Sequence, residues 1–154
     1  MLFELRKLNS EEESIVLHAP IWTALLIGFA DGELQAGELE KLKEMIHVKT
    51  YSELNDVRNL YQELEKYEES AQILERELSI LPTNPEARIK YLEESLAKLN
   101  YILPKLTVPY GRQFLHSLRE IAAAVANAEG GFLGFGTISR AESKYIHLPM
   151  INEV

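Results

Sequence analysis

Apolar residues recur along most of this chain at intervals of three and four positions, the spacing of one face of an α-helix. The run from Ala19 to Ala30 is almost continuously apolar. It predicts a buried helix over about 11–30, with Pro20 either kinking that helix or starting its second half. Alternation of apolar and polar residues, which marks a half-buried strand, is nowhere sustained. The pattern therefore predicts an all-α fold.

Further helices are expected on the same grounds. They cover about 36–47, 52–80, 84–103, 109–128 and 139–147. The segment 52–80 carries an apolar stripe that includes Ala71, Leu74 and Leu78, and it is either one long charged helix or two helices split near 66–70. Pro104 ends the helix that precedes it. We expect one domain over 1–154, with six to seven helices.

Pairs of Ser or Thr followed three residues later by Glu mark helix starts. In such a pair the hydroxyl accepts from a first-turn amide, and the glutamate bonds back to the cap amide. Four of these pairs are interpreted as helix starts: Ser10/Glu13, Thr50/Glu53, Thr83/Glu86 and Ser139/Glu142. Each of these four pairs predicts a helix start close to the hydroxyl residue.

A short pattern occurs twice in the chain. The first copy runs from His18 to Gly32 and ends Ala30-Asp31-Gly32, and the second runs from His116 to Gly130 and ends Ala128-Glu129-Gly130. Each copy reads as an apolar helix that stops at a small residue, an acid and a glycine. We therefore expect an internal pseudo-twofold repeat, with halves over roughly 11–50 and 109–149 that are joined by the helices of 52–103.

Carboxylates follow both helix ends and are the candidate functional residues. Asp31 and Glu129 stand at the two ends, and Glu38 and Glu142 open the helices that come next. Divalent cations such as Ca²⁺ and Mg²⁺ prefer several oxygen ligands, so a metal site built from these four acids is one interpretation. Turn chemistry and helix capping are the other.

Composition excludes several classes of protein. With no cysteine, the chain has no disulfide, no zinc–thiolate site and no thiol nucleophile. Its net charge of -8 argues against nucleic-acid binding, which needs a basic face. The longest apolar run has about 12 residues, whereas a membrane span needs about 20. No targeting segment is recognisable either, so we expect a cytoplasmic protein. No catalytic motif is recognisable, so we expect that the protein is not an enzyme.

The sequence Gly28-Phe29-Ala30-Asp31-Gly32, followed by Glu38 and an amphipathic helix, resembles the tellurite-resistance TerB-like family. The second copy, with Glu129-Gly130 and then Ser139 to Glu142, is similar to the second half of such proteins. The resemblance implies an all-helical domain whose two halves gather Asp31, Glu38, Glu129 and Glu142 into a divalent-metal site. It also implies a role in stress and metal-oxyanion resistance as an interaction or sensing module.

Two functions follow from these observations. The first is a non-enzymatic, stress-related binding or sensing module that holds Ca²⁺ or Mg²⁺ and acts on a protein partner. The alternative is a metal-free scaffold for protein–protein interaction, which would use the long charged helix of 52–80 or the loop 130–136. That loop is rich in Gly and Phe and could lie against a partner. The sequence does not indicate an oligomeric state.

Overall fold

A computed structural model describes residues 4–30, 34, 36–52, 55–66, 69–129 and 140–154. Within these ranges the structure has seven α-helices of six or more residues and no strand, which confirms the predicted all-α fold. The elements are η1 (Glu4–Lys7), α1 (Ser10–Phe29), α2 (Ala36–Ser52), α3 (Asn55–Lys66), α4 (Glu69–Ile80), α5 (Pro85–Ala97), α6 (Leu99–Ile102), η2 (Leu103–Lys105), α7 (Val108–Glu129) and α8 (Arg140–Tyr145). None of the helices in these ranges is long and apolar enough to cross a membrane.

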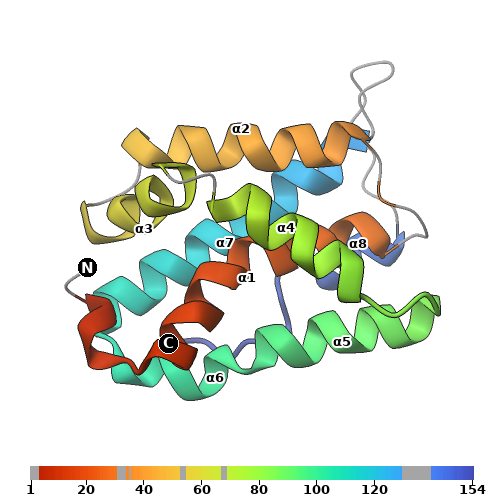
Figure 1. Ribbon diagram of the computed structural model, residues 1–154. Coiled ribbons are helices and arrows are strands. Elements are labelled where there is room, and N and C mark those ends of the chain that lie inside the picture. The colour runs from red at the N-terminus through yellow and green to blue at the C-terminus, as the bar shows by residue number, and fades with distance from the viewer. Residues whose placement is uncertain (1–3, 31–33, 35, 53–54, 67–68, 130–139) are drawn as a thin grey trace.

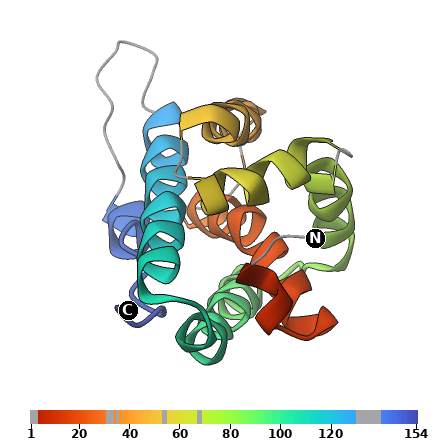
Figure 2. The ribbon, with the colours of Figure 1, turned by 90° about the vertical axis from the view of Figure 1, so that its left-hand side faces the viewer.

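Helix α1 lies at the centre of the molecule, and the other helices surround it (Figures 1 and 2). It packs against α7, α5, α2 and α4, and all its residues from Ala19 to Gly28 are buried. This explains its continuous apolar run, because a helix covered on every side needs no polar face. Buried side chains from every helix join in one hydrophobic cluster.

The helix expected over 11–30 is the single helix α1, and Pro20 lies inside it. Other helix boundaries depart from the expected ones in two places. Helix α2 continues to Ser52, beyond the predicted end near 47. The predicted helix over 84–103 ends at Ala97, and α6 and then η2, which contains Pro104, complete the segment.

The start of α1 is capped one residue earlier than predicted. Asn9, not Ser10, is the N-cap: its side chain accepts from the Glu12 amide at 2.8 Å. The Glu12 carboxylate accepts from the Asn9 amide at 3.0 Å. A capping box is therefore present, but it is built from Asn9 and Glu12 and not from Ser10 and Glu13, because Asn caps a helix as well as Ser does.

Two further capping predictions are also wrong. Thr50 lies within α2, so the pair Thr50/Glu53 does not begin a helix. Helix α5 is capped by Asn84 rather than Thr83, and the Asn84 side chain accepts from the Ala87 amide at 3.0 Å. In both α1 and α5, the N-cap is an asparagine next to the Ser or Thr that was expected to cap the helix.

The segment 52–80 forms two helices, which is the second of the expected alternatives: α3 ends at Lys66 and α4 begins at Glu69. The predicted apolar stripe does not describe α4. Leu78 is 40% exposed and Ala71 is exposed, whereas Ile73 and Glu77 are buried. Helix α4 therefore turns the Glu77 carboxylate toward the interior. There it is contacted by polar side chains of α1 and α5.

The pseudo-twofold relation between the two halves is not confirmed. In the first half α1 is followed by α2, which has 17 residues, whereas in the second half α7 is followed by α8, of which the structure describes 6 residues. The apolar helices α1 and α7 are similar in length, with 20 and 22 residues. The likeness of the halves is therefore strongest in these first helices.

Candidate functional site

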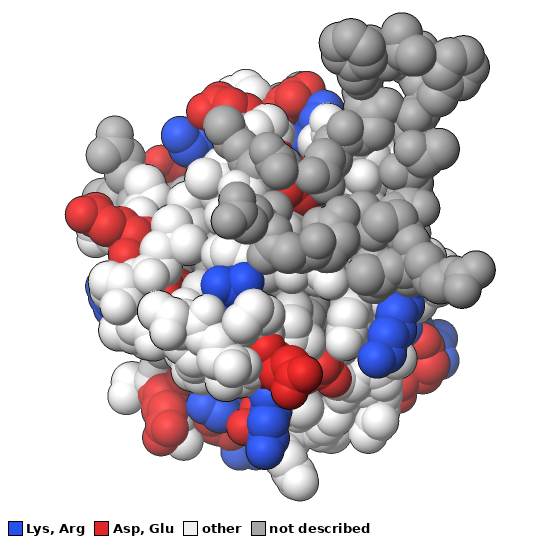
Figure 3. Space-filling model, turned by 90° about the vertical axis from the view of Figure 1, so that its right-hand side faces the viewer, with Lys and Arg blue, Asp and Glu red and all other residues white. Residues whose placement is uncertain are grey.

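The helices that carry or directly precede the candidate acids meet at one end of the molecule. In Figure 1, α1 and α7 both end on the right-hand side, where α2 begins and α8 lies, and Figure 3 looks onto this end. Gly37, in the first turn of α2, and Ala128, in the last turn of α7, line the same cavity of about 410 Å³. The start of the helix after the first acid motif therefore lies beside the second motif.

Glu38 is the candidate that the structure describes most fully. It lies in the first turn of α2, and only 1% of it is exposed. A Cβ atom on Gly28 of α1 would stand 3.6 Å from Glu38 Oε2 and 2.1 Å from Leu34 Cδ1. The small residue at Gly28 thus leaves room for the Glu38 carboxylate and Leu34 against the last turns of α1. Buried carboxylates are in general paired with a positive group or bound to a cation.

The three other candidate acids are described only in part. Glu129 is the last residue of α7 and Glu142 lies within α8, but the placement of their side chains is outside what the structure describes. Asp31 itself lies outside the described residues, as do Ser139 and the loop 130–136. Ala30, however, lines a cavity together with Tyr145 of α8, so the end of α1 lies beside α8.

Helix ends add to the negative potential at this end of the molecule. Neither α1 nor α7 has a basic residue in its last turn. The last carbonyl groups of a helix lack partners within it and give its C-terminus a partial negative charge. Two such helix ends, together with carboxylates, form an environment that favours a cation.

Among the described residues, no group of three or more Asp, Glu, His or Cys side chains is placed to hold a metal ion. Of the four acids predicted to share a site, Glu38 alone has a described side chain. The ends of α1 and α7 and the start of α2 lie with α8 at one end of the molecule, but a cluster shared by the four acids remains a prediction.

Polar contacts at the other end of α2 fix its position on α7. The Lys49 ammonium, whose side chain is 2% exposed, donates to Glu120 of α7 at 2.9 Å. It also stands 5.9 Å from the centre of the Tyr61 ring of α3. The Tyr61 hydroxyl is 2.8 Å from Ser117 Oγ of α7. These contacts join α2, α3 and α7 and so help to place the start of α2 beside the end of α7.

A second polar network, which the sequence did not indicate, joins α1, α4 and α5. Glu77 is 3% exposed and accepts from the Tyr91 hydroxyl at 3.0 Å. His18 Nε2 stands 3.7 Å from the other Glu77 oxygen, and His18 Nδ1 is 2.7 Å from the Ser14 carbonyl oxygen. His18 of α1 therefore lies beside an acid of α4. In the sequence, Glu77 lies four residues after the apolar Ile73, but the apolar stripe of Ala71, Leu74 and Leu78 predicts a different buried face.

This network predicts a specific alkaline loss of stability. Burial, together with the Glu77 carboxylate, raises the pKa of the Tyr91 phenol above its usual value of about 10. Because the folded-state pKa exceeds the unfolded one, the neutral phenol stabilises the fold below about pH 10 and this contribution is lost above it. We expect the free energy of unfolding to fall more steeply above about pH 10 in the wild type than in Tyr91→Phe.

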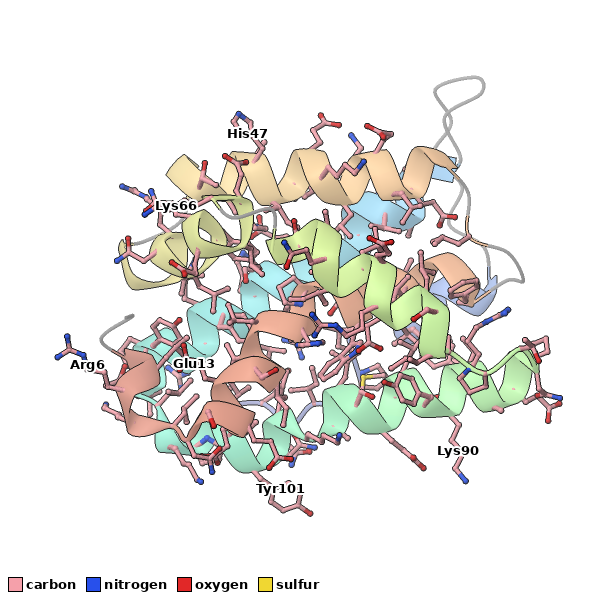
Figure 4. The ribbon with its side chains drawn as sticks, in the orientation of Figure 1. Arg6, Glu13, His47, Lys66, Lys90 and Tyr101 are labelled. Atoms are coloured by element: carbon pink, nitrogen blue, oxygen red, sulfur yellow. The ribbon has the colours of Figure 1, made fainter. Side chains whose placement is uncertain are left out.

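Urea unfolding at a series of pH values measures that slope. The control is Tyr101→Phe, because Tyr101 is 80% exposed and points into solvent (Figure 4). Its slope should equal that of the wild type. Equal slopes for Tyr91→Phe and the wild type would contradict the role given to Tyr91.

Comparison of the chain with protein-family models, with curated proteins and with solved structures finds no match. The class of fold therefore rests on the structure, and the resemblance to the TerB-like family rests on the short motifs around Asp31 and Glu129.

Proposed function

We propose that the protein is a non-enzymatic binding module that holds a divalent cation between its two acid motifs and acts in a stress response as a sensor. The ligands would come from Asp31 and Glu38 in the first half and from Glu129 and Glu142 in the second. The family resemblance suggests the cellular context, and the chemistry of the four acids suggests the ion.

One observation carries the proposal: the first turn of α2 and the last turn of α7 line one cavity, between Gly37 and Ala128. Glu38 and Glu129 are the next residues along the chain from these two positions. Acids that lie far apart in the sequence are thus carried by helix ends that are neighbours in space.

The choice of ion follows from the ligands. Carboxylate and carbonyl oxygens suit Ca²⁺ and Mg²⁺. Ca²⁺ takes six to eight oxygen ligands at about 2.3–2.6 Å, whereas Mg²⁺ keeps several waters and needs one or two carboxylates. A site that recruits all four acids and helix-end carbonyl groups would favour Ca²⁺, and a site with Glu38 and one further acid would favour Mg²⁺.

Thermal unfolding tests the proposal. A cation that binds only the folded state stabilises it by about 2.7 kcal/mol when its concentration is 100 times its Kd. For a chain of this size, the melting temperature should rise by roughly 5–10 °C over the value in EDTA. An unchanged melting temperature in millimolar Ca²⁺, Mg²⁺ and Mn²⁺ would remove the support for a cation site.

The metal-free scaffold is the second candidate and has a different signature. If Asp31 and Glu129 only shape turns and helix ends, replacing both with Ala should lower stability modestly and leave any response to cations as it was. The structure divides the charged segment 52–80 into α3 and α4, so a scaffold would not present it as one continuous helix.

A further inference from the structure

A groove runs between the end of α1, the outer face of α5 and α8, next to the proposed cation site, but none of the four candidate acids lines it. Its volume is about 560 Å³, the size of a pocket that accepts a few side chains. We name it the α5 groove. Apolar side chains that include Phe29, Ile89 and Tyr145 line it. An apolar hollow of this size is a place where another molecule can bury surface.

Acidic side chains edge the groove along α5. Glu86 and Glu93 line it with Ile89, and their spacing of three and four residues puts all three on one face of the helix. In the described part of the chain, no basic residue forms an ion pair with Glu86 or Glu93. Two carboxylates beside an apolar floor are therefore available to a positively charged ligand.

The basic side chains near the groove are already engaged by its own residues. Lys90 extends from the same helix (Figure 4) and pairs with Glu94 at 3.9 Å. The Arg88 guanidinium lies 4.0 Å from the centre of the Phe29 ring. The Lys144 ammonium lies 5.2 Å from the centre of the Tyr145 ring. They therefore do not neutralise the two remaining carboxylates by pairing.

We propose that the α5 groove binds a short segment of a partner protein in which one or two apolar side chains are flanked by Lys or Arg. The apolar side chains would lie on Ile89 and Tyr145, and the basic ones would pair with Glu86 and Glu93. A basic segment also matches the net charge of -8, which speeds the encounter with a cationic partner.

The probe is a library of random 12-residue peptides displayed on phage and selected against the full chain in EDTA. With no cation present, the outcome is independent of the proposed metal site. We expect the selected peptides to combine large apolar residues with Lys or Arg. Selection of acidic or purely apolar peptides, or the absence of any shared pattern, would overturn the proposal. A purely apolar pattern would point instead to a second copy of this chain or another hydrophobic ligand.

Matched double variants locate the binding of a selected peptide. Glu86→Gln with Glu93→Gln should weaken it about tenfold, because each exposed ion pair contributes up to about 1 kcal/mol. The double variant Glu63→Gln with Glu75→Gln also removes two negative charges, but from exposed positions on α3 and α4 outside the groove. It should change the affinity for the peptide less than about twofold. Equal weakening by both double variants would show that the peptide responds to net charge alone, and would contradict docking in the groove.

Discussion

Replacing Phe114 with Ala should destabilise the protein by about 3–5 kcal/mol, the largest stability effect that we expect from one substitution. Phe114 lies in α7, is 0% exposed and belongs to the central hydrophobic cluster. The substitution removes the transfer free energy of the ring and leaves a cavity that close-packed neighbours fill only in part. Since domains of this kind are stable by about 5–15 kcal/mol, the loss is a large fraction of the total.

Urea unfolding measures the effect, and Tyr101→Ala is the matched control. Tyr101 is also aromatic, but it is 80% exposed and extends away from α6 (Figure 4). Its removal should change the free energy of unfolding by no more than about 0.5 kcal/mol. Comparable losses for the two variants would mean that α7 does not pack against the core as described.

Replacing Glu38 with Gln should remove most of the cation-dependent rise in melting temperature. The amide has nearly the shape of the carboxylate but no charge, so a site that uses this ligand should lose at least about tenfold in affinity. The melting temperature in EDTA, measured alongside, reports any change in folding that is independent of the cation.

The matched control for Glu38 lies two residues further along the chain, on the exposed side of α2. Glu40 is on the same helix, is exposed, and pairs with Lys43 at 3.5 Å on the solvent side. Glu40→Gln makes the same chemical change and should keep the full response to cations. An undiminished response in Glu38→Gln, or an equal loss in both variants, would exclude Glu38 as a ligand.

Local sequence patterns predicted which segments are helical better than they predicted where the helices begin. The Asn9 and Ser10 side chains cap helices with similar strength, so propensity cannot decide between neighbours. The choice depends on where the first turn of α1 lies against the core, which is a tertiary effect. The same reasoning explains why Asn84, and not Thr83, caps the start of α5.

The buried face of α4 could not be predicted, because its polar partners are distant in the sequence. Hydrophobic periodicity assigns Leu78 to the interior and Glu77 to solvent. In the structure, His18 of α1 and Tyr91 of α5 contact Glu77 and favour the opposite register. Burial of a polar group depends on such partners, and a pattern read along one helix cannot show them.

The candidate site was predictable in its residue types but not in its assembly. The repeated motif singled out Asp31 and Glu129 by position alone. The packing of α2 on α7, which brings Gly37 near Ala128, depends in part on the buried Lys49 and its contact with Glu120. A buried lysine is uncommon, and no local pattern predicts it.

The central claim is that carboxylates from both halves of the chain bind one divalent cation at the end of the molecule where α1 and α7 terminate. A crystal of the full chain soaked in Mn²⁺ tests it most directly, through anomalous diffraction. We expect one strong anomalous peak within roughly 2.0–2.6 Å of an acid from the first half, Asp31 or Glu38, and of an acid from the second half, Glu129 or Glu142. A Mn²⁺ peak that contacts acids of one half alone, or no peak at this end, would contradict the claim.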